Sequence, residues 1–98
     1  MTRYNVVLLP EAEAEVREAF LWYRERSPLA AEAFRTEVFD AVDSLATSAT
    51  MWLEDEDGFR RYVLRHFPYT LFYEIVARTV NVFAVAHHRR RPGYWQPR

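Results

Sequence analysis

The stretch YTLFYEIVARTVNVFAVA, residues 69–86, contains two runs rich in Val, Tyr, Phe and Thr on either side of Ala77 and Arg78. These residue types favour β-strands, where their side chains pack on a pleated surface. A connection of two residues is typical of an antiparallel hairpin. We therefore predict two antiparallel strands, Tyr69–Val76 and Thr79–Ala86, at the centre of the fold.

Two more segments are predicted to be strands. Arg60–Arg65 has the period of two that is typical of a half-buried strand, and it follows an acidic loop, EDEDG, that ends at Gly58. The run YNVVLLP, residues 4–10, is apolar and β-branched and ends in proline. The chain is therefore expected to begin with one strand and to end with three.

The segment between these strands predicts two α-helices. Pro10 suits the first position of a helix, and acids crowd the following turn, where the helix dipole favours them. Ser27 and Pro28 suit the N-cap and the first position of a second helix. Apolar residues recur at spacings of three and four, so the two helices should form a hairpin with a shared apolar face. The apolar positions are Ala12, Val16, Ala19, Phe20 and Tyr23 in the first helix and Phe34, Val38, Ala41, Val42 and Leu45 in the second.

These elements predict a single α+β domain over residues 1–98. It has an N-terminal strand, a two-helix hairpin and then three antiparallel strands, with the helices packed on one face of an antiparallel sheet. Half of the residues are hydrophobic, which suffices for one core at this length. The apolar run before Pro10 is too short for a secretion signal or a membrane span, so we expect a cytoplasmic protein without membrane contact.

The two halves of the chain differ in charge although the net charge is −1. Residues 1–49 contain nine Asp and Glu against five Arg, whereas residues 50–98 contain eight Arg against five Asp and Glu. The cationic last third suits an anionic partner, and the acidic first half suits a different one. All thirteen basic residues are arginine, which either serves bidentate contacts with phosphate and carboxylate or reflects a GC-rich genome.

The sequence argues against several kinds of site. There is no cysteine, and the three serines lie in or beside the helices, far in sequence from every histidine, so we do not expect acyl transfer. His66, His87 and His88 lack metal-site spacing, because adjacent side chains on a strand point to opposite faces. We therefore expect neither a metal nor another cofactor.

The chain ends in HHRRRPGYWQPR, residues 87–98. Three successive arginines beside aromatic residues supply the donors and the stacking plane that nucleic-acid contacts use. The same tail also suits docking on an acidic protein surface, or packing of its aromatics on the hairpin. The candidate target-binding residues are His87, His88, Arg89, Arg90, Arg91, Tyr94 and Trp95.

We expect this tail to carry the function while contributing little to folding. Pro92 and Gly93 interrupt regular structure, and three successive arginines cannot all be buried. Trp95 is the exception, because its indole suits an anchor of the tail against the hairpin.

Three segments resemble one protein family: YNVVLLPEAEAEVREAFLWY at the start, HFPYTLFYEI, and VNVFAVAHHRRRPGYW near the end. The order of elements, the Pro-Tyr entry to an aromatic strand and the His- and Arg-rich end are similar to the RelE/ParE toxins of bacterial type II toxin–antitoxin modules. The resemblance spans nearly the whole chain. It implies a toxin that blocks growth of its own cell until a cognate antitoxin, encoded beside it, binds and neutralises it.

The resemblance also implies one of two mechanisms. RelE-like members cleave mRNA on the ribosome and use an arginine directly after the tyrosine of the aromatic strand, where this chain has Thr70. Their later basic residue and tyrosine match His88 and Tyr94. They also tend to be strongly basic, which suits RNA, whereas this chain has net charge −1. Both departures favour a ParE-like toxin, which binds and poisons DNA gyrase without chemistry of its own.

Two alternatives stay open. A ribosome-dependent endoribonuclease acting on mRNA would use Tyr94 as base, His88 as acid and Arg90 as phosphate clamp. Under this alternative Tyr94→Phe should remove most activity, whereas a gyrase-binding toxin should keep it. A domain that has lost its toxicity would only bind its antitoxin.

The expected antitoxin interface rests on apolar surface beside the predicted core. Trp22 and Phe39 lie off the apolar faces of their helices, although a wider core would also explain them. Arg61 and Arg65 share one face of their strand, where acidic side chains of an antitoxin can reach them. We therefore expect an antitoxin helix or strand to lie across these four residues in a toxin–antitoxin hetero-oligomer.

Overall fold

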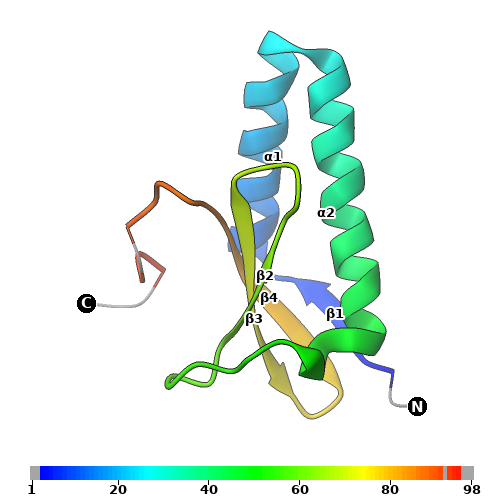
Figure 1. The fold of residues 1–98 in the computed structure, drawn as a ribbon, viewed down its shortest axis with the longest axis vertical. Coiled ribbons are helices and arrows are strands. Elements are labelled where there is room, and N and C mark those ends of the chain that lie inside the picture. Colours follow the sequence, from blue (N-terminus) through cyan, green and yellow to red (C-terminus); the bar gives the residue numbers. More distant parts are fainter. Residues whose placement is uncertain (1–2, 92, 96–98) are drawn as a thin grey trace.

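Figure 1 shows the fold of the computed structural model, which describes residues 3–91 and 93–95. The order of elements is the predicted one, with one strand, two helices and then three strands. The elements are β1 (Asn5–Leu8), α1 (Pro10–Arg26), α2 (Pro28–Ser48), the 3-10 helix η1 (Ala49–Met51), β2 (Arg60–Val63), β3 (Tyr69–Val76) and β4 (Thr79–His87). Across the part of the chain that the structure describes, neither helix has the length and apolar character needed to cross a membrane.

Local signals start and end the two helices where they were predicted. Pro10 and Pro28 occupy the first turns of α1 and α2. The Ser27 hydroxyl accepts a hydrogen bond from the N–H of Ala30 at 3.2 Å. The N–H of Ser27 donates to the carbonyl of Tyr23 at 2.7 Å. One residue therefore ends α1 and caps α2, and the helices run side by side as a tight hairpin (Figure 1).

The four strands form one mixed sheet in the order β1-β4-β3-β2. The predicted hairpin is confirmed, since β3 pairs antiparallel with β4, and β2 pairs antiparallel with β3. β1 instead pairs in parallel with β4, from Asn5 opposite Thr79 to Leu8 opposite Val82. The expectation of a wholly antiparallel sheet is corrected at this edge. No short turn joins β1 to β4, and the long intervening chain allows the parallel pair.

One face of the sheet packs against the helices and forms the core. The predicted helix positions that are buried are Ala12, Ala19, Phe34, Val38, Ala41 and Leu45. From the sheet side, Leu71 and Tyr73 are fully buried against them. The phenol of Tyr73 donates to the carbonyl of Ala49 at 2.7 Å, which ties β3 to η1 at the end of the helical hairpin.

The other face of the sheet carries a second, aromatic cluster. A register shift between Phe72 and Tyr73 inserts Phe83 as an extra residue on β4. The ring centroids of Phe83 and Phe59 lie 4.8 Å apart. The Trp95 ring lies 4.3 Å from Phe72 and 5.7 Å from Phe83. The segment that ends at Trp95 therefore packs on the sheet face opposite the helices, and Trp95 anchors it as predicted.

Candidate functional site in the C-terminal tail

The C-terminal tail (residues 88–91 and 93–95) folds back on the domain directly after β4. The N–H of His88 donates at 2.8 Å to a carbonyl in the loop before β3. The N–H of Arg90 donates to the carbonyl of His87 at 2.9 Å, which turns the chain away from the strand direction. The tail is therefore held against the sheet from its first residue onward.

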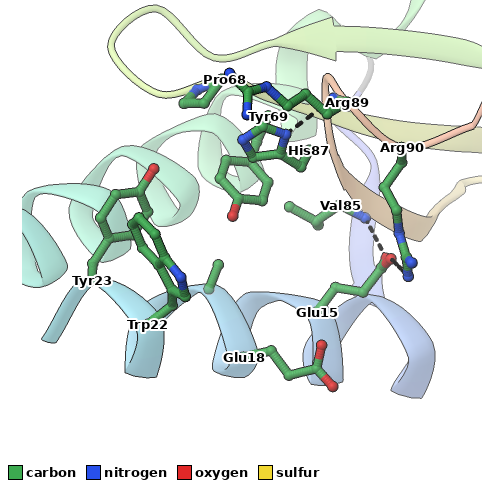
Figure 2. Close-up of a pocket in the computed structure, with 11 residues that line it drawn as sticks. Glu15, Glu18, Trp22, Tyr23, Pro68, Tyr69, Val85, His87, Arg89 and Arg90 are labelled. Carbon is green, nitrogen blue, oxygen red and sulfur yellow. Dashed lines mark hydrogen bonds and ion pairs between the residues drawn. The ribbon is translucent and has the colours of Figure 1, made fainter. Parts of the chain in front are cut away.

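Glu15 of α1 ties the tail to the fold. Its Oε1 accepts a hydrogen bond from the N–H of Val85 at 2.8 Å, and its Oε2 accepts one from the phenol of Tyr94. Arg90 Nη2 lies 3.9 Å from the same Oε2, and the Arg90 guanidinium lies 4.3 Å from the centre of the Tyr94 ring. We call Glu15, Val85, Arg90 and Tyr94 the Glu15 cluster. Figure 2 shows the contacts of Glu15 with Val85 and Arg90.

Glu15 was not among the residues expected at the site, because it is one of several acids in α1. A signal was present, since Glu15 lies three residues after Ala12 and four before Ala19, on the buried face of the helix. A carboxylate on such a face needs hydrogen-bond partners. The expectation that only Trp95 anchors the tail is therefore wrong, because Tyr94 and Arg90 also contact the domain.

The Tyr94 phenol is a poor candidate for a general base. Burial raises the pKa of Tyr94 well above its ordinary value, the hydrogen bond to Glu15 raises it further, and Arg90 opposes these effects only in part. The phenol therefore remains protonated at neutral pH and acts as a donor. Tyr94→Phe would break the contact with Glu15 as well as remove a proton-transfer group, so it does not separate the two toxin mechanisms.

The two adjacent histidines have different surroundings. His87 packs edge-on against Tyr69 with ring centroids 5.0 Å apart. Burial lowers the pKa of His87, and the charges of Arg89 and His88 lower it further. His88 Nε2 lies 3.0 Å from Thr70 Oγ1. Thr70 is buried, and its hydroxyl faces His88. This hydroxyl stands at the position where RelE-like toxins carry an arginine.

Two hollows flank the tail. The α1 groove, about 740 Å³, lies between α1 and the ends of β3 and β4 (Figure 2). The tail hollow, about 480 Å³, lies between the tail and the acidic loop before β2. The candidate target-binding residues that line the α1 groove are His87, Arg89 and Arg90, and those that line the tail hollow are His87, His88, Arg90, Arg91, Tyr94 and Trp95. The structure therefore brings all seven candidates to these two adjoining surfaces.

The tail hollow combines both signs of charge. Asp55 and Asp57 line it together with Arg61, Arg90 and Arg91. Asp55 also forms an ion pair with Arg61 on β2 at 3.5 Å. A phosphate chain entering this hollow would meet carboxylates as well as guanidinium groups, which weakens its attraction for nucleic acid.

The predicted antitoxin-binding residues lie on different surfaces. Trp22 is 51% exposed and lines the α1 groove. Phe39 is 46% exposed and lines a separate hollow of about 490 Å³ beside α1, α2 and β1. Arg61 lies on β2, and Arg65 follows that strand. The exposure of Trp22 and Phe39 excludes a wider core as the explanation for these two aromatics. The four predicted antitoxin-binding residues, however, do not form one continuous patch.

Glu37 of α2 holds the connection between β2 and β3. Its Oε2 accepts hydrogen bonds from the N–H of Arg65 at 2.6 Å and of His66 at 3.1 Å. Its Oε1 lies 2.8 Å from Nδ1 of His66. Burial by itself would raise the pKa of Glu37, but the hydrogen bonds from His66 and Arg65 lower it below its ordinary value. Folding therefore favours the ionised carboxylate.

We expect Glu37→Gln to destabilise the protein by about 1–2 kcal/mol at neutral pH, because charge-assisted hydrogen bonds become neutral ones. Since folding lowers the pKa of Glu37, its contribution is present above the ordinary value of 4.5 and is lost as the pH falls through the lower folded value. Urea unfolding at several pH values measures this. Asp40→Asn, at an exposed position of α2, is the control. A difference from the parent that stays constant down to about pH 3 would contradict the assigned role.

Comparison with known proteins decides the family. The family model of the ParE toxin of type II toxin–antitoxin system, parDE, matches residues 6–92. The chain belongs to the ParE toxin family. Membership confirms the resemblance noted in the sequence and its ParE-like branch. A ParE toxin of a parDE system implies a cognate ParD antitoxin as the partner of this chain.

A solved structure shows the same fold. The chain is similar to a structure titled "Chromosomal ParDE TA system from P. aeruginosa", with a TM-score of 0.77 and 15% sequence identity, over 87% of this chain and 96% of that one. At this identity the likeness shows the fold alone. No curated protein matches the chain. Within residues 3–91 and 93–95, no three His, Asp or Glu side chains gather in a group that could hold a metal ion.

Proposed function

We propose that this ParE toxin inhibits growth by binding and poisoning DNA gyrase through its C-terminal tail. The observation that carries the proposal is the state of Tyr94, whose phenol is a partly buried donor to Glu15. A tyrosine held in this way gives the tail a defined shape and withholds the group that would act as a base. The exposed Arg89 and Arg91 then serve as contacts with the target.

The runner-up function is ribosome-dependent cleavage of mRNA. Its proposed acid, base and clamp, His88, Tyr94 and Arg90, all line the tail hollow, which favours this alternative. Arg90 already contacts the carboxylate of Glu15 and the ring of Tyr94, and these contacts would compete with a phosphate for its guanidinium. The carboxylates beside the hollow also disfavour RNA. Gyrase binding is therefore the better-supported function.

Purified enzymes distinguish these functions. The toxin should inhibit DNA supercoiling by gyrase and cause cleaved DNA to accumulate when the gyrase is denatured. Translating ribosomes given the same toxin should keep their mRNA intact. Cleavage of mRNA without an effect on gyrase would establish the endoribonuclease instead. A protein that does neither but still binds its antitoxin would be a domain that has lost its toxicity.

We further propose that the antitoxin binds across the helical hairpin and uses Trp22 and Phe39 as anchors. Both rings are exposed, and each borders a hollow that an apolar side chain can fill. The exposed Arg61 and Arg65 lie further along the same chain and suit acidic side chains of the antitoxin. Because these residues lie on separate surfaces, the antitoxin would have to wrap around the toxin, as an extended segment can.

Trp22→Ala should weaken binding of the antitoxin by roughly 30-fold, the factor for an interface anchor worth ~2 kcal/mol. Isothermal titration calorimetry with the purified antitoxin measures this. Trp52→Ala is the matched control, because Trp52, in the loop before β2, is also partly exposed but packs on Tyr62 of that strand. If Trp22→Ala and Arg65→Glu both leave the affinity unchanged, the antitoxin interface lies elsewhere.

A further inference from the structure

The Glu15 cluster lies where β1 no longer reaches β4. The parallel pairing of these strands ends with Leu8 opposite Val82, and the chain then enters α1 at Pro10. Beyond this point, the Oε1 of Glu15 accepts the hydrogen bond of the Val85 N–H. A side-chain carboxylate from α1 therefore takes the place of a strand carbonyl at this edge of the sheet.

The second carboxylate oxygen of Glu15 faces the tail. It accepts the hydrogen bond of the Tyr94 phenol and forms the ion pair with Arg90. The Tyr94 ring packs edge-on against Trp95 at 5.3 Å, and Trp95 packs on the sheet. One carboxylate, whose side chain is only 17% exposed, thus joins α1, β4 and the tail. Burial makes these hydrogen bonds stronger than they would be in water.

The cluster also determines where the neighbouring arginines lie. Arg89 lines the α1 groove, and Arg91 lines the tail hollow on the other side. Arg90 lies between them in sequence and is held by Glu15 (Figure 2). The exposed Arg89 and Arg91 therefore lie on either side of the residue that Glu15 holds. A surface arranged before binding loses less conformational entropy when a partner docks.

We propose that Glu15 is a positioning residue of the toxin, which holds the tail so that Arg89 and Arg91 meet gyrase in one geometry. The inference rests on the proposed function, because it assigns Glu15 a role in the contact between the tail and gyrase. Glu15 acts through Tyr94 and Arg90 and does not itself contact the target.

Glu15→Gln tests the proposal because it keeps the size of the side chain and removes its charge. Amide hydrogen exchange in a peptide spanning the tail should become at least roughly tenfold faster, which corresponds to ~1.4 kcal/mol. Inhibition of gyrase should weaken by about the same factor, because the tail must then be ordered on binding. Glu11→Gln is the matched control. Glu11 is an exposed acid one turn earlier on α1 that lines neither hollow, and both readouts should stay at parent values.

Tyr94→Phe is the second variant, and it tests the positioning role of Glu15 if Glu15→Gln does not fold. It removes the tail's hydrogen bond to Glu15 and leaves the Val85 bond in place. Tyr94→Phe should also speed amide exchange in the tail and weaken the inhibition of gyrase. Where both variants fold, their combination should have less than the sum of the single effects, because both remove the same contact.

Two results would overturn the positioning role. One is a tail whose exchange stays at the parent rate in these variants. The other is a loosened tail with unchanged inhibition of gyrase, which would make Glu15 a purely structural residue. If gyrase inhibition survives Glu15→Gln but is lost when the tail arginines are replaced, the positioning role of Glu15 is wrong and the proposed function still stands. A parent toxin without any effect on gyrase would overturn the proposed function and this inference with it.

Discussion

The triple variant Arg89→Gln, Arg90→Gln, Arg91→Gln should abolish growth arrest on expression while the protein keeps its fold. Each arginine offers a target several charged donors that glutamine cannot replace, and the loss of buried charged contacts costs several kcal/mol in an interface. Gyrase inhibition by the purified variant should therefore fall by roughly 100-fold or more.

The melting temperature should change little in this variant. Arg89 and Arg91 are exposed, and the ion pair of Arg90 with Glu15 is partly open to solvent, where such a pair contributes about 0–1 kcal/mol. The matched control replaces Arg3, Arg24 and Arg78, which are exposed elsewhere, with glutamine and removes the same charge. Full toxicity of the tail variant would mean that the working surface lies elsewhere, with the face of β2 around Arg61 as the next candidate.

Trp95→Ala should lower the free energy of unfolding by about 3 kcal/mol, because the indole loses its packing on Phe72 and Phe83. It should also abolish growth arrest at an expression level that leaves the protein folded, because the tail loses its anchor. Urea unfolding and a growth assay measure the two effects. Trp95→Phe, which keeps an aromatic ring at the site, should restore most of the stability.

The matched control for Trp95→Ala is Trp52→Ala, on the loop before β2. Trp52 packs on Tyr62 with ring centroids 5.0 Å apart and is 39% exposed, so its removal should cost less than half as much. Equal losses at the two positions would show that the aromatic cluster under the tail is no stronger an anchor than an ordinary surface contact.

Growth arrest and stability together separate the two roles of the tail. The arginine variant should lose toxicity without losing stability, whereas Trp95→Ala should lose both. If the tail acted only as structural cover, the arginine variant would keep its toxicity. The pair of experiments therefore tests whether one short segment both covers the sheet and contacts the target.

The sequence by itself predicted most of the features that depend on neighbours in the chain, although it placed the end of β2 at Arg65 instead of Val63 and did not predict η1. The period of two and the two-residue connection predicted the β3–β4 hairpin, and Ser27 with Pro28 predicted the break between the helices. Recurrence at three and four residues predicted six of the buried helix side chains and missed Ala31 and Ala46. The tail composition pointed to seven of the residues that line the two hollows. These signals are readable because backbone conformation and side-chain direction depend on a few adjacent residues.

The tertiary structure alone decided the features that join distant segments. β1 lies parallel to β4, and Phe83 enters β4 as an extra residue, because pairing across the sheet depends on how the whole helical hairpin packs. Glu15 meets Tyr94 only in the folded chain, although the alanines around it marked a buried position. A carboxylate on a buried helix face must find partners, and the sequence does not tell which distant donors fold within its reach.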